Sequence, residues 1–161
     1  INAVAAAVLG AGLAFGVLPQ GTFNYFGRAH GIPADTDSAL DILFADKPAP
    51  VQVGVVDDRI FLVNASLGLH PQLLEDREAW TAGLGRRRWV AAGAAIASLL
   101  RGAHVLLLRV TLQGETRDLS TPTLFVGNNA LQLASLGLAA ADEVGAGSLS
   151  AHVLKPVGRF R

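Results

Sequence analysis

The chain has 161 residues, with 13 basic side chains, 13 acidic side chains and no cysteine, which is enough for one domain with part of a second. The zero formal net charge excludes nucleic acid as a partner, because phosphate binding needs a basic excess. The lack of cysteine excludes disulfides, thiolate metal sites and a cysteine nucleophile, and fits a cytoplasmic protein. Hydrophobic residues reach 51% and charged residues only 16%, so we expect another domain, a second copy in a homodimer or a membrane to cover apolar surface.

Residues 1–18 carry no charge. Gly10 and Gly12 interrupt this apolar run and no basic segment precedes it, so we reject both a membrane span and a secretory signal. The pattern predicts a buried helix over Asn2–Leu9, a turn, and a buried strand over Leu13–Leu18. A chain that begins inside such a helix is expected to be a piece of a longer α/β protein, with its apolar excess concentrated in residues 1–18.

The next predicted elements are helical. A loop from Pro19 leads into a helix that ends near His30, and Asp35 or Thr36 caps a second helix that runs through Ala45. The sequence KPAP at residues 47–50 then breaks the helical pattern. We place a domain boundary there, which divides residues 1–48 from residues 49–161.

Beyond this boundary the hydrophobic period changes to two. Residues 51–55 and 60–63 predict a hairpin around an Asp-Asp turn. Further along we expect a loop at 64–68, helices at 71–80 and 84–100, strands at 105–113, 115–119 and 124–126, a loop at 127–147 and a last strand at 148–154. The predicted fold class is therefore α+β.

The segment PQGTFNYFGR at residues 19–28 carries the clearest chemical signal. A Gly-Thr turn that enters a helix presents backbone N–H groups and the positive end of the helix dipole, which suits an anion. Gly21 allows close approach of a ligand, Thr22 can cap the helix and Asn24 adds an amide. A capped helix without any ligand is the alternative that such a turn leaves open.

Three segments resemble the diacylglycerol kinase catalytic-domain family, which includes bacterial lipid kinases and eukaryotic diacylglycerol, ceramide and sphingosine kinases. The first is GVLPQGTFNYFGRAHGIP at 16–33, the second is FLVNASLGL at 61–69, and the third is LFVGNN at 124–129. All three occur in the family's order and at compatible spacing. The resemblance therefore rests on a combination of motifs rather than on any one of them.

The resemblance implies a remnant of an α/β nucleotide-binding domain in residues 1–48, followed by a β-sandwich-like domain with inserted helices in residues 49–161, truncated at its end. It implies ATP and Mg²⁺ as cofactors of the complete protein, and a lipid substrate that is met at the inner, cytoplasmic membrane surface. Ile1 would directly follow the family's Gly-Gly-Asp-Gly-Thr phosphate loop, so part of the N-terminal domain would be missing. Candidate ATP-binding residues are Gly21, Thr22 and Asn24, and candidate residues of the substrate cleft are Asn64, Ser66, Gly68 and Asn128. Such amides also commonly satisfy backbone groups.

Two departures from the family pattern remove carboxylates. Tyr25 stands where many members carry Asp, and Ala146 stands at the position of the family's general base. Asp142 and Glu143 lie just upstream and are the candidate substitutes. The sequence thus predicts a diacylglycerol kinase-like lipid kinase, present here as an inactive fragment. The alternatives are a non-catalytic lipid- or nucleotide-binding relative and, less favoured by the motifs, a kinase for a soluble substrate.

Overall fold

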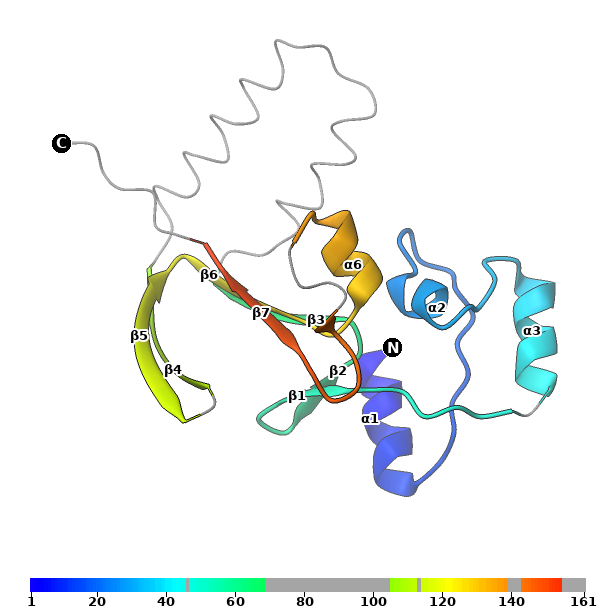
Figure 1. Ribbon diagram of the computed structural model, residues 1–161. Helices are drawn as coiled ribbons and strands as arrows, with labels where there is room; N and C mark the ends of the chain where they lie inside the picture. Colours follow the sequence, from blue (N-terminus) through cyan, green and yellow to red (C-terminus); the bar gives the residue numbers. More distant parts are fainter. Residues whose placement is uncertain (46, 69–104, 113, 139–142, 155–161) are drawn as a thin grey trace, which may run out of the picture. The chain divides into compact units, whose positions relative to one another are not determined.

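The computed structural model describes residues 1–45, 47–68, 105–112, 114–138 and 143–154 (Figure 1). These residues form a mixed fold of short helices and small sheets, which agrees with the predicted α+β class at this level of detail. The helices are α1 (Asn2–Ala11), α2 (Tyr25–Ala29), α3 (Thr36–Phe44) and α6 (Ala130–Ser135). The strands are β1 (Gly54–Val56), β2 (Arg59–Phe61), β3 (Asn64–Gly68), β4 (Leu106–Leu112), β5 (Glu115–Thr121), β6 (Thr123–Gly127) and β7 (Ser150–Val153).

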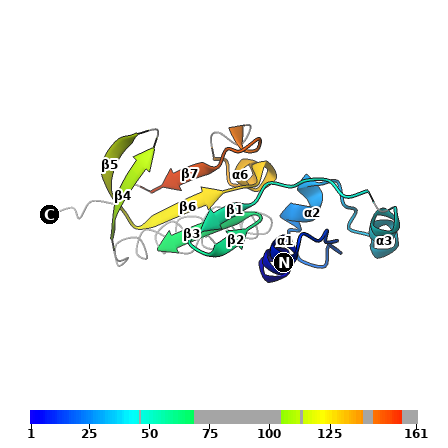
Figure 2. The same cartoon turned by 90° about the horizontal axis from the view of Figure 1, so that it is seen from below.

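The strands form three small sheets, which Figure 2 shows from a second direction. They pair as β1-β2, β3-β6-β7 and β4-β5. The chain divides into two compact units: the first contains residues 1–65 and 126–150, and the second contains residues 66–125 and 151–161. Helices α1, α2, α3 and α6 all belong to the first unit.

The ends of two predicted helices have the expected physical causes. Helix α1 ends at Gly12, whose left-handed backbone (φ 68°) is the usual way for glycine to terminate a helix. Helix α3 begins after Asp35, whose carboxylate accepts the backbone N–H of Ser38 at 2.9 Å. Asp35, rather than Thr36, is therefore the cap.

The core of the first unit collects residues from distant parts of the chain. Ala5, Phe26 and Leu62 are buried together, and the partly buried side chains packed against them are Phe15, Val17, Val51, Val53, Ile60 and Val63. Helix α1 is also tied to the end of β2, because the backbone N–H of Leu62 donates to Oδ1 of Asn2 at 3.2 Å.

The prediction of a strand over residues 13–18 is wrong. The segment pairs with no strand in the part of the chain that the structure describes. Phe15 and Val17 are half-buried while their neighbours Ala14, Gly16 and Leu18 are exposed. The hydrophobic alternation therefore packs one side of an extended segment, but a strand also needs a ladder of hydrogen bonds to a neighbour.

The predicted hairpin forms, and two of the later predicted strands pair as a second hairpin. In the first, β1 pairs antiparallel with β2 around Asp57, which has a φ of 52°, a conformation that Asp tolerates better than most residues. In the second, β4 pairs antiparallel with β5, with Leu108 opposite Leu119. Strand β5 continues to Thr121, two residues beyond its predicted end.

Two predicted loops contain regular structure instead. Residues 64–68 form β3, which pairs with β6 although its sequence, NASLG, has little intrinsic preference for a strand; here pairing within the fold overrides local propensity. The predicted loop at 127–147 contains α6, whose first turn is capped by Asn129. The helices predicted at 71–80 and 84–100 lie outside the described residues.

Exposed apolar side chains are more widespread than the sequence predicted. Helix α1 does leave Val4 and Leu9 more than half exposed, as expected for residues 1–18. However, Phe44 is 80% exposed and Leu107 is 85% exposed, so the excess is not concentrated at the N-terminal end. Among the described residues, no helix combines the length and apolar character needed to cross a membrane.

Candidate functional site

The loop that precedes α2 is closed by its own asparagine. Asn24 has left-handed backbone angles (φ 47°, ψ 37°), and its Oδ1 accepts the backbone N–H of Gly21 at 2.8 Å. Asn24, and not Thr22, is the residue from which α2 begins, so the prediction of a threonine cap is wrong. The physical reason is that a short amide side chain both tolerates this backbone conformation and bonds to nearby backbone groups. The Gly21 N–H is therefore already used within the loop.

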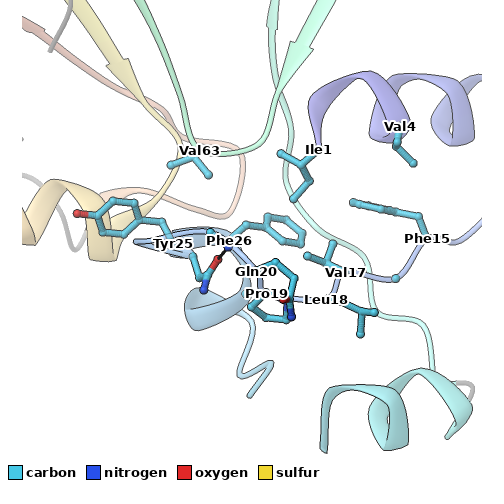
Figure 3. Close-up of a pocket in the computed structure, with 14 residues that line it drawn as sticks. Ile1, Val4, Phe15, Val17, Leu18, Pro19, Gln20, Tyr25, Phe26 and Val63 are labelled. Carbon is cyan, nitrogen blue, oxygen red and sulfur yellow. Dashed lines mark hydrogen bonds between the residues drawn. The ribbon is translucent and has the colours of Figure 1, made fainter. Parts of the chain in front are cut away.

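A cavity of about 500 Å³ lies beside this loop, within the first unit (Figure 3). It is walled by α1, the extended segment after it, the loop and the start of α2. Its lining consists of Ile1, Val4, Phe15, Gly16, Val17, Leu18, Pro19, Gln20, Gly21, Asn24, Tyr25, Phe26, Gly27 and Val63. None of these side chains is charged, so no side chain of the lining could neutralise a phosphate. The side chains of Gln20 and Asn24 are its most polar groups.

Tyr25 points away from the cavity, toward α6 (Figure 3). Its hydroxyl lies 2.8 Å from Oγ of Ser135. Its backbone oxygen accepts a hydrogen bond from Nδ2 of Asn129 at 3.1 Å. The ring stacks on Phe23, with centroids 5.6 Å apart, and the Arg28 guanidinium carbon lies 5.8 Å from the ring centroid. Tyr25 thus joins α2 to α6 by hydrogen bonding.

Asn128 is one of five amide residues of the first unit that make side-chain hydrogen bonds within the fold. We call them the amide cluster: Gln52, Asn64, Asn128, Asn129 and Gln132. Nδ2 of Asn128 donates to the backbone oxygens of Gln52 and Leu62, at 3.0 Å each. Its Oδ1 accepts Nε2 of Gln52 at 2.7 Å, and its backbone N–H donates to Val63 at 2.7 Å. The amide therefore satisfies backbone groups within the fold.

The other predicted cleft residues are divided between the two units. Asn64 lies in the first unit, where its Nδ2 donates to Oε1 of Gln132 at 2.8 Å. Ser66 and Gly68 belong to the second unit, and both are exposed. Gly68 has a φ of 91°, and a Cβ added to it would lie 2.3 Å from the backbone oxygen of Pro122. A common role of these residues in substrate binding stays a prediction.

Ala146 lies at the tip of a tight turn. The backbone groups of Gly145 and Ser148 bond to each other in both directions, at 3.2 and 2.9 Å, and the two central residues, Ala146 and Gly147, have φ values of 49° and 92°. Two positive φ angles are the signature of a type I′ turn. Ala146 is exposed, as is Glu143, whereas Asp142 lies outside the described residues.

Gln52, which was not among the residues predicted from the sequence, contacts this turn. Its Oε1 accepts the backbone N–H of Gly147 at 2.6 Å, and its Nε2 donates to the backbone oxygen of Ser148 at 2.9 Å. Gln52 is the one polar residue among the valines at 51, 53 and 55 of the first hairpin arm. That interruption of an apolar run was the available signal.

A magnesium site of three or more acidic or histidine side chains does not occur among the described residues. We therefore assign no residue to the Mg²⁺ ion that the family resemblance implies, and we derive no step through a metal. For ATP, the cavity offers neutral polar groups from Gln20 and Asn24 but no charged side chain. It fits an uncharged part of a ligand better than a chain of phosphates.

Comparison with protein families supports the resemblance found in the sequence. Residues 1–56 match the family model described as the diacylglycerol kinase catalytic domain. Over 70 residues the chain is 37% identical to a protein of Klebsiella pneumoniae (strain 342) named a probable lipid kinase YegS-like. This alignment covers 42% of the chain and 24% of the Klebsiella protein. A diacylglycerol kinase of Staphylococcus haemolyticus is 38% identical over 53 residues, which cover 33% of the chain and 16% of that protein.

The fold of the chain is also similar to that of a solved structure. The solved structure of a candidate diacylglycerol kinase from Bacillus anthracis str. Sterne superposes with a TM-score of 0.56 and 21% identity. The match covers 89% of this chain and 48% of the Bacillus chain. Over residues 1–56 the chain is thus similar to the diacylglycerol kinase catalytic domain, and it spans less than half of the length of the relatives that it matches.

Proposed function

We propose that this chain is part of an ATP-dependent lipid kinase of the diacylglycerol kinase type, which phosphorylates a lipid hydroxyl. The observation that carries the proposal is the family match over residues 1–56, because it includes the whole loop from Pro19 to Asn24. In that assignment residues 1–48 are the remnant of an α/β nucleotide-binding domain, and residues 49–161 form a β-sandwich-like domain that holds the lipid.

Phosphoryl transfer depends on positioning the two reactants, on neutralising the phosphate charge and on a base that accepts the hydroxyl proton. ATP, when bound, supplies the phosphoryl group. The chain's own contribution is the loop of Gly21, Thr22 and Asn24, which Asn24 holds in a fixed shape. This loop, residues 19–24, carries no cationic side chain, and we propose that the 161 residues alone are inactive.

The second candidate is a lipid- or nucleotide-binding relative that has lost catalysis. It is favoured by one observation, namely that the methyl group of Ala146 occupies an exposed turn tip at the family's base position. A methyl group accepts no proton, and the loss of a general base typically slows a reaction by about 10²–10⁴-fold. Glu143 is the described carboxylate nearest in sequence that can replace the base.

The test compares the purified chain with the full translation product of its reading frame. Both are assayed for transfer of the γ-phosphate of labelled ATP to diacylglycerol in vesicles, and to glycerol as a soluble alcohol. We expect transfer to diacylglycerol by the full product and none by the chain. If the full product transfers no phosphate but sediments with the vesicles, the non-catalytic candidate is correct, and transfer to glycerol alone would show a soluble substrate.

Two variants of the full product locate the base. Ala146→Asp is expected to raise the turnover number by about 10²–10⁴-fold if the base position is empty. If Glu143 already serves as the base, Ala146→Asp has little effect and Glu143→Gln abolishes transfer. Asp58→Asn, on the exposed turn of the first hairpin, is the control carboxylate that we expect to be neutral.

The lipid substrate also implies a place of action. Diacylglycerol resides in bilayers, so we propose peripheral binding at the inner, cytoplasmic membrane surface. A homodimer is a further proposal, for which the exposed apolar side chains of α1 provide a surface. Vesicle sedimentation and light scattering of the full product measure these two properties independently of phosphate transfer.

A further inference from the structure

The cavity beside the loop at residues 19–24 has walls of two kinds. Most of its lining is apolar, and Phe15 and Phe26 give it an aromatic part, with ring centroids 6.0 Å apart (Figure 3). Gln20 and Asn24 add one side-chain amide each. A volume of about 500 Å³ is within the usual range for pockets that hold small molecules, and such pockets combine apolar walls with a few polar groups. The cavity therefore has the size and the composition of a ligand site.

Each of the two amides keeps one polar atom free. Oδ1 of Asn24 accepts the Gly21 N–H at 2.8 Å, which fixes the orientation of this amide and leaves its Nδ2 as a donor. Nε2 of Gln20 donates to Oγ1 of Thr36 at 3.2 Å, which leaves its Oε1 as an acceptor. Within the part of the chain that the structure describes, neither free atom has a hydrogen-bond partner. The lining thus offers one donor and one acceptor.

These two free atoms decide which class of ligand suits the cavity. An acyl chain would bury them without a hydrogen bond, which is unfavourable. A phosphate group would meet no charged side chain in the lining, and the Gly21 N–H is already used within the loop. A nucleobase has apolar faces and carries donor and acceptor atoms on its edge. A nucleobase therefore suits both the apolar walls and the two amides.

We propose that the cavity holds the base of the nucleotide, with Nδ2 of Asn24 and Oε1 of Gln20 bonded to the edge of the base and the apolar lining packed against its faces. The inference rests on the proposed function, which requires ATP, so adenine is the base to test. The sequence pattern indicated an anion at this loop. The free atoms of the lining instead recognise the uncharged part of the nucleotide.

The experiment measures the binding of adenosine, which has the base but no phosphate, to the full translation product by isothermal titration calorimetry. Asn24→Asp keeps the Oδ1 that closes the loop and replaces the free donor by an oxygen. Gln20→Leu removes the free acceptor. We expect each substitution to raise the Kd for adenosine about tenfold. Because Asp also tolerates the left-handed backbone of position 24, this variant should fold.

Two further variants complete the set. Leu18→Trp places a larger side chain on an exposed part of the cavity wall, so it should raise the Kd for adenosine without any change in the loop itself. Asn2→Asp is the matched control, because it exchanges the same amide for a carboxylate at a residue that does not line the cavity. Its Kd for adenosine should equal that of the unmodified protein.

Two other probes separate the remaining ligand classes. Binding of decanoate without binding of adenosine would assign the cavity to an acyl chain and overturn the inference. Binding of ribose 5-phosphate without binding of adenosine would assign it to a phosphate and overturn the inference as well. Adenosine binding that Asn24→Asp, Gln20→Leu and Leu18→Trp all leave unchanged would place the base elsewhere. If adenosine binds as expected but the full product transfers no phosphate, the proposed function fails while the assignment of the cavity stands.

Discussion

Asn128→Asp tests the amide cluster most directly. The substitution keeps the shape of the side chain but turns the Nδ2 donor into an oxygen. That oxygen would face the backbone oxygens of Gln52 and Leu62, which lie 3.0 Å from Nδ2 in the present structure. Two attractive contacts thereby become repulsive, and both carbonyl groups lose a donor.

The expected loss of stability follows from these contacts. Two hydrogen bonds contribute roughly 0.5–1.5 kcal/mol each, and a half-buried polar group left without a partner costs roughly 1–3 kcal/mol more. We expect the free energy of unfolding at pH 7 to fall by about 3–5 kcal/mol. For a chain of this length that corresponds to a decrease in Tm of roughly 6–20 °C.

The loss should depend on pH. The surrounding carbonyl oxygens favour the protonated acid, so we expect the pKa of the carboxyl group introduced at position 128 to be raised in the folded state. Between the unfolded and folded pKa values the folded chain then binds more protons, so stability falls as the pH rises through this window. The deficit should therefore be smallest at acidic pH, below both values. Urea unfolding followed by circular dichroism between about pH 4.5 and 8 measures this trend.

Asn2→Asp is the matched control. Within the described part of the chain, the side-chain hydrogen bond of Asn2 is the one in which its Oδ1 accepts the Leu62 N–H, and a carboxylate oxygen accepts equally well. A negative charge in the first turn of α1 is also favourable. If Asn128→Asp is as stable as Asn2→Asp at pH 7, the Nδ2 contacts of Asn128 do not exist and the expected destabilisation has no basis.

Three further variants test other features of the fold. Ala146→Asn should raise the free energy of unfolding by about 0.5–1 kcal/mol, because Asn tolerates the left-handed backbone. Ala14→Asn, in the extended segment, is the control and should not raise it. Equal Tm values for the two variants would contradict the turn assignment. Thr121→Val should lower the free energy of unfolding by about 1–3 kcal/mol. The fully buried Thr121 hydroxyl accepts a backbone N–H and lies within hydrogen-bond distance of two backbone oxygens. An unchanged free energy of unfolding in urea would exclude these hydrogen bonds. Asp35→Ala should destabilise the chain at pH 7. The Ser38 N–H lowers the pKa of Asp35 below its usual 3.8. The stability that this hydrogen bond contributes is therefore present above pH 3.8 and is lost as the pH falls through the lowered pKa. A stability difference from wild type that persists unchanged in unfolding at about pH 2 would contradict the cap.

The sequence predicted elements well where local signals agree with the fold. The Asp35 cap, the glycine at the end of α1 and the hairpin around Asp57 all depend on residues close together in the chain. The strand predicted at 13–18 failed because pairing depends on a neighbour that a local pattern does not reveal. The prediction of a loop at residues 64–68 failed for the opposite reason. These residues have a weak local preference for a strand, but pairing with β6 makes them strand β3.

The candidate site was predictable only in part. The loop of Gly21 and Asn24 was found from its sequence, but the closing hydrogen bond between them depends on the left-handed backbone of Asn24. Gln52 was missed because its partners lie 76 to 96 residues away. A lone glutamine in an apolar run shows that a polar partner is needed, but it does not show which one.

The long separations within the first unit have a consequence for biosynthesis. Gln52 and Asn128 are 76 residues apart in the chain. At a synthesis rate of about 5–20 residues per second, Asn128 is therefore synthesised roughly 4–15 s after Gln52. During that interval the hydrophobic side chains of residues 1–65 lack the α6 segment that ties α2 in place. Nascent chains of this protein should therefore be bound by ribosome-associated chaperones until residue 150 has emerged.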